Sequence, residues 1–199
     1  MPKPAHEDQN QASRQIDQPQ DTPGEGRDQQ KGKARSREIA ADRAQATCQF
    51  CDTDFVGTGG TLGGKFADAV ALATQVAALW PTPTHDHRFV VLTGGEPLLQ
   101  VDAPLVAALH AQGFRIAVET NGSIAAPEGI DWLCVSPKAG ADWVQREGDE
   151  LKVVWPQPGL DWAALEAARF SHRYLQPMDG PLRAQNTEAS IALCLARPA

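Results

Sequence analysis

The sequence lacks several features that would assign a protein to a class at once. It has only four cysteines in 199 residues, too few for a disulfide scaffold and typical of a reducing, cytoplasmic location. No apolar run approaches the roughly 20 residues that span a bilayer, and the polar N-terminus predicts no secretory signal. The net charge of -7 argues against a basic nucleic-acid-binding surface. What remains is a globular domain of ordinary composition, with 42% hydrophobic residues.

Residues 1–40 differ in composition from the remainder of the chain. They are rich in Gln, Asp, Arg, Lys and Pro, and their only large apolar side chains are Met1, Ile16 and Ile39. Such a segment cannot bury enough apolar surface to offset the entropy lost on ordering. We therefore expect residues 1–40 to be disordered and residues 41–199 to form one folded domain.

From Lys65 onward, helical and strand patterns alternate. Helices are predicted at 65–80, 104–112, 161–169 and 187–196, the last three with Asp102, Asp161 and Asn186 as N-terminal caps. Strands are predicted at 88–92, 115–119, 131–135, 150–155 and 173–175. This order indicates an α/β fold with a parallel sheet, either an open doubly wound sheet or a partial parallel (β/α) barrel.

Polar or charged residues follow four of the predicted strands, in segments 93–97, 119–122, 136–138 and 176–180. In parallel α/β folds, ligands bind at the carboxyl ends of the strands, so these segments predict an active site there. The alternative is that strand ends are polar because loops are solvated. Four successive strands end in chemically specific residue types, which favours the active site.

Cys48 and Cys51 form a Cys-x-x-Cys pair that can ligate zinc or iron. By itself this spacing is weak evidence for a metal site, and a redox-active disulfide is a further alternative. Cys134 lies in an apolar strand and Cys194 in an apolar helix, so both are predicted to be small core residues. The spacing alone leaves zinc, an iron–sulfur cluster and redox chemistry open.

The segment Thr93-Gly94-Gly95-Glu96-Pro97 suits a ligand-binding loop. The two glycines let the backbone approach a ligand closely, and Glu96 can accept from an ammonium group. A polar turn without a ligand is the alternative, and it is less credible for this segment directly after a strand.

Two further groups have both a functional and a structural interpretation. Asp52, Thr53 and Asp54 supply oxygen ligands that suit Mg²⁺, or they cap a loop. Lys138 can bind a carboxylate or ribose hydroxyls, or it is a solvated surface lysine. Residue chemistry leaves each pair of alternatives about even.

Five segments occur here in one order: 48–54, 93–97, 119–122, 136–138 and 176–180. This set resembles the radical S-adenosylmethionine (SAM) superfamily and, within it, the 7-carboxy-7-deazaguanine synthase family, from about residue 36 to the C-terminus. Cys-Asp-Thr-Asp, Ser-Pro-Lys and Gln-Pro-Met-Asp-Gly together are not general superfamily features. The resemblance therefore points to this family in particular.

The resemblance implies a partial (β/α) barrel with a [4Fe–4S] cluster, SAM and Mg²⁺. Three cysteines would hold the cluster, and reductive cleavage of SAM would give a 5′-deoxyadenosyl radical that takes a hydrogen from 6-carboxy-5,6,7,8-tetrahydropterin. Ring contraction with loss of ammonia would give 7-carboxy-7-deazaguanine on the way to queuosine, a tRNA modification. The implied protein is a cytoplasmic, homodimeric lyase with a reductase or flavodoxin-type electron donor, binding neither nucleic acid nor membrane.

The same resemblance assigns individual residues by their place in the motifs. Cys48 and Cys51 match the second and third cluster ligands, and Thr53 matches the Mg²⁺ ligand. Thr93 matches a substrate contact. The implied SAM contacts are Phe50, Asp52, Gly95, Glu96, Ser136, Lys138, Gln176 and Asp179.

The sequence departs from the family pattern at both ends. No cysteine precedes Cys48, and residues 1–35 replace the family's first strand, its substrate turn and an arginine before the first cysteine. The chain also stops at Ala199, short of the family's last segment. We expect a wrong start or shifted reading frame in the gene model and a truncated end, and mass spectrometry of the native protein can refute this by finding peptides from residues 1–35. As written, the chain has two of three cluster ligands, which puts its activity in question.

Two other functions compete with the synthase. A glycyl-radical-enzyme activase shares the cluster and the Gly-Gly-Glu-Pro loop, but gives no reason for Cys-Asp-Thr-Asp or Gln-Pro-Met-Asp-Gly. A non-catalytic remnant or zinc-binding module that uses Cys48 and Cys51 belongs to a different class. About four irons per chain after anaerobic reconstitution would separate the first two functions from the third.

Overall fold

The computed structural model describes residues 62–81 and 87–197. The helical elements are α2 (Ala69–Ala78), η2 (Pro97–Leu99), α3 (Ala103–Ala111), α4 (Trp162–Ala167) and α5 (Arg183–Ala196). The strands are β1 (Phe89–Leu92), β2 (Arg115–Thr120), β3 (Trp132–Val135), β4 (Glu147–Trp155) and β5 (Arg169–Pro177). The predicted disorder of residues 1–40 and the predicted sites from Cys48 to Thr53 lie outside the described residues.

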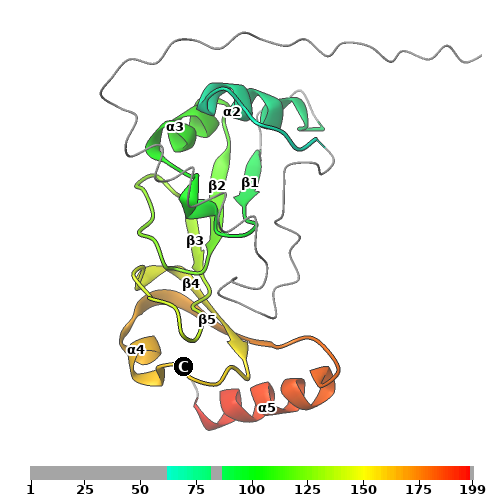
Figure 1. Ribbon diagram of the computed structural model, residues 1–199, viewed down its shortest axis with the longest axis vertical. Helices are drawn as coiled ribbons and strands as arrows, with labels where there is room; N and C mark the ends of the chain where they lie inside the picture. Colours follow the sequence, from blue (N-terminus) through cyan, green and yellow to red (C-terminus); the bar gives the residue numbers. More distant parts are fainter. Residues whose placement is uncertain (1–61, 82–86, 198–199) are drawn as a thin grey trace, which may run out of the picture.

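The strands form a five-stranded parallel sheet in the order β1-β2-β3-β4-β5. Every pairing between neighbours is parallel, and the register places Leu92 beside Val118 and Val135 beside Leu151. A doubly wound sheet reverses its strand order at a switch point, whereas this order follows the chain. The structure therefore decides for the partial-barrel arrangement, with α2 and α3 beside β1 and β2 and with α4 and α5 beside β4 and β5 (Figure 1).

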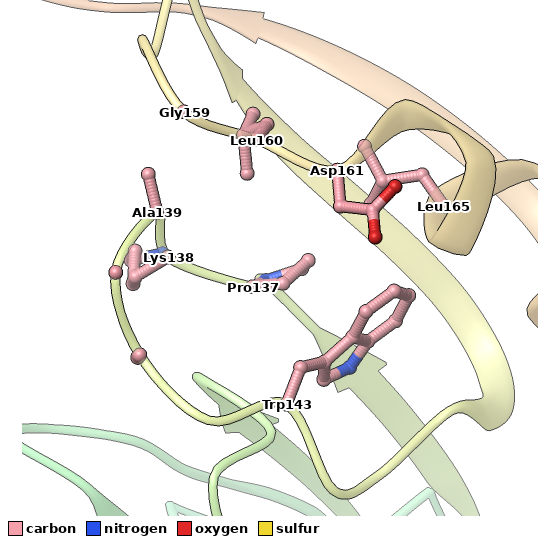
Figure 2. A pocket seen from close by; sticks show the side chains of 10 residues that line it. Pro137, Lys138, Ala139, Trp143, Gly159, Leu160, Asp161 and Leu165 are labelled. Atoms are coloured by element: carbon pink, nitrogen blue, oxygen red, sulfur yellow. The ribbon is translucent and has the colours of Figure 1, made fainter.

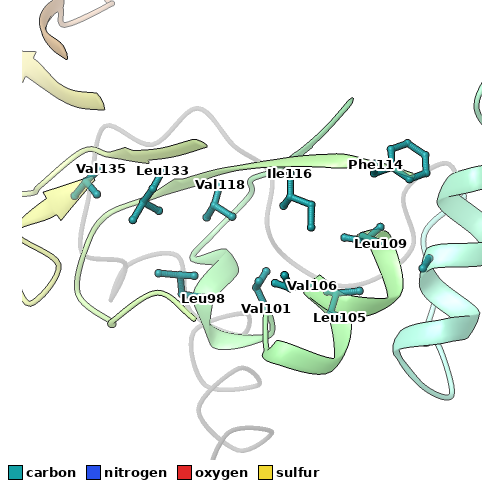
Figure 3. Packing of buried hydrophobic residues seen from close by; sticks show 11 residues of the cluster. Leu98, Val101, Leu105, Val106, Leu109, Phe114, Ile116, Val118, Leu133 and Val135 are labelled. Carbon is teal, nitrogen blue, oxygen red and sulfur yellow. The ribbon is translucent and has the colours of Figure 1, made fainter. Parts of the chain in front are cut away.

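One face of the sheet is packed against helices. Figure 3 shows side chains from α3 and η2 meeting those of β2 and β3, in a cluster that includes Leu98, Val101, Leu105, Val106, Leu109, Ile116, Val118, Leu133 and Val135. Leu109, Ile116, Val118 and Val135 are fully buried. Beyond β3 the layer continues with Leu151, Val153 and Leu165, against which the half-buried Trp143 and Phe170 pack. Because side chains alternate along a strand, the other residues of each strand face away from these helices.

Two of the three predicted helix caps are confirmed. The Asp102 carboxylate accepts from Leu105 N at 3.0 Å, and that of Asp161 accepts from Ala164 N at 3.1 Å. The prediction for Asn186 is wrong, because α5 begins four residues earlier, at Arg183, and its N-cap, Leu182, makes no side-chain hydrogen bond. Asn186 instead lies inside the helix and is buried.

The last strands are longer than the sequence pattern indicates. β5 spans Arg169–Pro177 rather than 173–175, because it pairs with β4 from Glu147↔Arg169 to Trp155↔Pro177. Most of β5 is exposed and carries no apolar pattern, so its length comes from backbone pairing. Cys134 is buried as predicted, but Cys194 is exposed on α5, which corrects its assignment to the core.

Across residues 62–81 and 87–197, the structure contains no helix with the length and hydropathy needed to cross a membrane.

Candidate active site at the carboxyl ends of the strands

Backbone and side-chain hydrogen bonds tie the carboxyl ends of the five strands together in series. Asn121 N donates to the Glu96 carboxylate at 2.8 Å, and Ser136 N donates to Thr120 O at 2.8 Å. Ala139 N donates to the Gln157 side chain at 2.8 Å, and Met178 N donates to Trp155 O at 2.7 Å. We call the segments 93–97, 120–122, 136–139 and 176–180 the carboxyl edge. All four polar segments expected from the sequence thus lie along one edge of one sheet.

Glu96 anchors the first loop of the carboxyl edge. Its Oε1 accepts from Leu98 N at 3.0 Å and from the Thr120 hydroxyl at 2.7 Å, while Oε2 accepts from Asn121 N at 2.8 Å. The residue is buried, with 9% of its surface exposed. A carboxylate with three donors from its own chain is an efficient link between β1 and β2. Local sequence patterns do not reveal this link, because Thr120 and Asn121 are 24 and 25 residues away from Glu96.

The backbone before Glu96 is the accessible part of this loop. Gly94 has φ +125°, a conformation that side chains rarely adopt. Among the described residues, none except its chain neighbours has an atom within 4 Å of the position that a Cβ would occupy. Thr93 and Gly95 are exposed. A ligand can therefore approach the main chain here, while the carboxylate of Glu96 faces its own protein.

The second loop, Ser136–Ala139, is held from both sides. Lys138 Nζ donates to the backbone oxygen of Ser136 at 2.8 Å and to its hydroxyl at 2.7 Å. The buried Gln157, which follows β4, accepts from Ala139 N. Ser136 and Lys138 are half-buried and neighbouring, so the lysine presents its charge together with an oriented hydroxyl.

The third loop, Gln176–Gly180, is fixed by the residue that was expected to be a helix cap. Asn186 Nδ2 donates to Met178 O at 2.9 Å, which fastens the loop to α5. Gln176 and Asp179 are exposed, and Asp179 lies 3.9 Å from Arg183. A polar amide near the start of an otherwise ordinary helix was the only sequence signal for this contact.

A small cavity of about 90 Å³ lies behind the Ser136–Ala139 loop (Figure 2). Its walls come from the segment after β3, including Pro137 and Trp143, and from the segment that leads into α4, including Leu160 and Asp161. Pockets that enclose a nucleotide-sized ligand measure roughly 300–1,000 Å³, so this cavity has no room for one.

The described residues contain no group of three or more His, Cys, Asp or Glu side chains that could hold a metal ion. Burial raises the pKa of the Cys134 thiol to about 12, and Glu150 adds to the shift, so this thiol is neutral at pH 7. A neutral, buried thiol is a poor metal ligand. Cys48, Cys51 and Thr53, the predicted metal ligands, and Phe50 and Asp52 lie outside the described residues.

Several groups of the carboxyl edge could bind parts of SAM, the cofactor that the sequence resemblance implies. An accessible glycine backbone suits the amino group of its methionine part, and the Ser136 hydroxyl with the Lys138 ammonium suits its carboxylate or ribose oxygens. Gln176 and Asp179 add exposed polar side chains at the far end of the edge. The donor set therefore fits a zwitterionic nucleoside cofactor.

Strand order and strand ends together define a class: a partial parallel (β/α) barrel with a candidate cofactor site at the carboxyl ends of its strands. No family model matches the chain. It is 60% identical over 158 residues to the 7-carboxy-7-deazaguanine synthase of Bradyrhizobium diazoefficiens, covering 79% of this chain and 75% of that protein. It is 49% identical over 164 residues to the synthase of Nitratidesulfovibrio vulgaris, covering 80% and 76%. The chain belongs to the 7-carboxy-7-deazaguanine synthase family, a group of radical SAM lyases.

A solved structure agrees with this fold. The crystal structure of QueE from Escherichia coli superimposes with a TM-score of 0.50 at 22% identity, covering 75% of this chain and 76% of that chain. The resemblance stated from the sequence motifs is confirmed. The activase and the zinc module are not favoured, because these relatives are named as the synthase.

Proposed function

We propose that the chain is a 7-carboxy-7-deazaguanine synthase that converts 6-carboxy-5,6,7,8-tetrahydropterin to 7-carboxy-7-deazaguanine and ammonia. The 60% identity to the Bradyrhizobium diazoefficiens synthase carries this proposal. The reaction is a net loss of NH₃ from the pterin, without net oxidation. The family's further properties, a homodimer and a reductase or flavodoxin-type electron donor, belong to the same proposal.

The carboxyl edge supplies the binding of SAM in this proposal. Gly95 offers its backbone to the amino group, while Ser136, Lys138, Gln176 and Asp179 surround the rest of the molecule. Glu96 supports the contact between the Gly95 backbone and the amino group indirectly. Its three internal hydrogen bonds hold the Gly94–Gly95 turn in place. Thr93, exposed beside this turn, is the proposed substrate contact.

Cys48, Cys51 and Thr53 are the proposed ligands of the cluster and of Mg²⁺. When bound, the cluster and SAM supply the organic radical that starts the reaction. The protein orients the substrate next to that radical and excludes competing reactions. A hydroxyl ligand such as Thr53 suits Mg²⁺, which usually keeps waters and takes one or two protein ligands.

Activity of the full 199-residue chain tests the proposal. The protein is reconstituted anaerobically with iron and sulfide, reduced, and mixed with SAM, Mg²⁺ and 6-carboxy-5,6,7,8-tetrahydropterin. About four irons per chain and formation of 7-carboxy-7-deazaguanine, followed by mass spectrometry, would support the proposal. A low iron content would show that Cys48 and Cys51 do not hold the cluster without a third cysteine ligand. Cys51→Ala is the matched control and should lose iron and product together. An iron-loaded chain that cleaves SAM without forming product would overturn the assignment of the substrate.

A further inference from the structure

The Ser136–Ala139 loop, in which Ser136 and Lys138 are the proposed SAM contacts, has an anchor at each end. Ser136 N donates to Thr120 O at 2.8 Å, which ties the start of the loop to β2. Ala139 N donates to Gln157 Oε1 at 2.8 Å, which ties the end of the loop to the segment after β4. The first anchor joins two backbones, as in any parallel sheet, whereas the second depends on one side chain. The position of the loop therefore depends on Gln157.

The peptide group between Lys138 and Ala139 is held at both of its polar atoms. Its oxygen accepts from Ala141 N at 3.2 Å, in a β-turn whose third residue is Gly140 with φ +80°. Its N–H belongs to the second residue of that turn, and the hydrogen bond of the turn does not use it. Inside a protein such an N–H needs an acceptor, and Gln157 Oε1 supplies one. Hydrogen bonds on both sides thus fix the plane of the peptide group that follows Lys138.

The side chain of Gln157 is itself held in one orientation. It is buried, with 5% of the residue exposed, and its Nε2 donates to Val154 O at 3.4 Å. An amide side chain has one donor end and one acceptor end, so the contact with Val154 leaves the oxygen for Ala139 N. A flipped amide would set its NH₂ group against the N–H of Ala139. Gln157 is therefore a fixed internal acceptor rather than a solvated polar side chain.

The space behind the loop makes this hydrogen bond more important. Figure 2 shows Pro137 and Ala139 on one side of the cavity of about 90 Å³, with Leu160 and Asp161 on the other side. Side chains that line a cavity lack the close contacts that a packed neighbour would make with them. With a cavity behind it, the loop relies on hydrogen bonds for its position, and the bond to Gln157 is the link at its end.

The position of the loop determines where its charge lies. Lys138 Nζ donates to Ser136 O at 2.8 Å and to Ser136 Oγ at 2.7 Å, so the ammonium group lies beside the hydroxyl. A rotation of the peptide group after Lys138 would move the backbone that carries both groups. Charge-assisted hydrogen bonds depend on distance and angle, so a displacement of about 1 Å weakens binding.

We infer that Gln157 is a positioning residue for SAM, because its Oε1 holds the Lys138–Ala139 peptide group and thereby places Ser136 and Lys138 for the cofactor. This role rests on the proposed function and adds to it a buried residue that acts through the loop. Removal of the acceptor oxygen should therefore weaken SAM binding even though Ser136 and Lys138 are retained.

Binding of SAM without a reductant, so that SAM is not cleaved, tests this role. The full chain is reconstituted with its cluster, and the dissociation constant is measured by calorimetry. Gln157→Met keeps the length of the side chain but removes the acceptor, and it should weaken SAM binding about tenfold, as for a lost charge-assisted contact. Gln157→Glu keeps an acceptor oxygen for Ala139 N and should bind SAM within about threefold of the unsubstituted chain.

Gln145→Met is the matched control. Gln145 makes the same pair of contacts at another place, because its Oε1 accepts from Ala126 N at 3.0 Å and its Nε2 donates to Glu147 O at 2.7 Å. The substitution should lower stability to urea about as much as Gln157→Met does, but it should leave the SAM dissociation constant unchanged. Equal SAM dissociation constants for Gln145→Met and Gln157→Met would show a merely structural role and overturn the inference.

A double-substitution cycle tests whether Gln157 acts through Lys138. Lys138→Met removes the ammonium group and should itself weaken SAM binding. In the Lys138→Met chain, Gln157→Met should cost much less than the tenfold loss expected in the unsubstituted chain, because the contact that it positions is already gone. Fully additive losses would overturn the inference.

Hydrogen exchange of residues 136–141, followed by mass spectrometry, gives a readout that needs neither cluster nor SAM. Gln157→Met should speed exchange in this segment, because Ala139 N loses its acceptor, whereas Gln145→Met should not. Unchanged exchange in Gln157→Met would overturn the inference. Should Gln157→Met fail to fold, Gln157→Asn withdraws the amide by one methylene group and should show the same faster exchange and weaker binding.

The outcomes separate this role from the proposed function. No SAM binding by the unsubstituted chain overturns the proposed SAM site and the role of Gln157 with it. Equal SAM binding by the unsubstituted chain and by Gln157→Met overturns the role of Gln157 alone. The expected pattern of SAM binding without formation of 7-carboxy-7-deazaguanine in the activity assay would overturn the proposed substrate and support the role of Gln157.

Discussion

The Thr120 hydroxyl at the end of β2 donates a 2.7 Å hydrogen bond to the Glu96 carboxylate in the loop after β1. Thr120 Oγ1 also accepts from Gly122 N at 3.0 Å, so one hydroxyl links two turns of the carboxyl edge. Both residues are buried. Glu96 therefore serves first as an anchor between adjacent strands, and the part of its loop that can meet a ligand is the backbone around Gly94 and Gly95.

Thr120→Val tests the hydroxyl of this link. The substitution keeps the β-branched shape but removes the donor to Glu96 and leaves Gly122 N without its acceptor. A buried group that loses its partner costs about 1–3 kcal/mol, and we expect the free energy of unfolding to fall by about 2 kcal/mol. Urea denaturation of the purified chain measures the change.

Thr187→Val is the control for that experiment. The Thr187 hydroxyl donates to Arg183 O on the exposed side of α5. Its loss should change the free energy of unfolding by less than about 0.5 kcal/mol. Equal effects of the two substitutions would contradict the assigned role of Thr120.

Glu96→Gln separates an anchor from a cofactor-binding carboxylate. The amide keeps one oxygen acceptor but presents an NH₂ group where the chain offers only donors, so the unfolding free energy without SAM should fall by about 1–2 kcal/mol. Glu188→Gln, at an exposed position of α5, should have almost no effect. If stability without SAM were unchanged and only SAM affinity fell, Glu96 would act on the cofactor directly.

Asn186→Asp tests the link between α5 and the Gln176–Gly180 loop. The shape is conserved, but an oxygen replaces the nitrogen that donates to Met178 O, so two acceptors face each other in a buried place. We expect a loss of about 2–3 kcal/mol in stability and weaker binding of SAM, measured by denaturation and calorimetry. Asn121→Asp is the matched control for stability, because Asn121 uses its oxygen to accept from Ser123 N and an aspartate can do the same. A small loss for Asn186→Asp would show that the loop does not depend on this contact.

The raised pKa of the Cys134 thiol predicts that the stability difference between the unsubstituted chain and Cys134→Ala depends on pH. Burial raises its pKa from 9.0 to about 12, so between pH 9 and pH 12 the unfolded chain loses a proton that the folded chain keeps. Stability from this group is complete below pH 9 and falls as the pH rises, by at most about 1.4 kcal/mol per pH unit. The advantage of the unsubstituted chain over Cys134→Ala should therefore shrink between pH 9 and pH 11. Cys194→Ala, at an exposed thiol, is the matched control.

Sequence patterns located the elements where local signals were strong. Asp102 and Asp161 cap their helices as predicted, because the carboxylate of an N-cap aspartate accepts a hydrogen bond from a backbone N–H only three residues later. The same reasoning was wrong for Asn186, whose partner is the backbone of another element. The full extent of β5 was missed for a similar reason, since backbone pairing with β4 holds it rather than an apolar pattern.

The sequence by itself determined the α/β class, the polar strand ends and the family, because these depend on residue types at fixed local spacings. Only the tertiary structure decided that the sheet runs in chain order, since apolar strand patterns do not encode which strand lies beside which. It also decided that Glu96 faces Thr120 and that Glu119 meets Lys152 across β3. Those contacts join residues 24 and 33 positions apart, and hydrogen bonds over such distances exist only after the strands have paired.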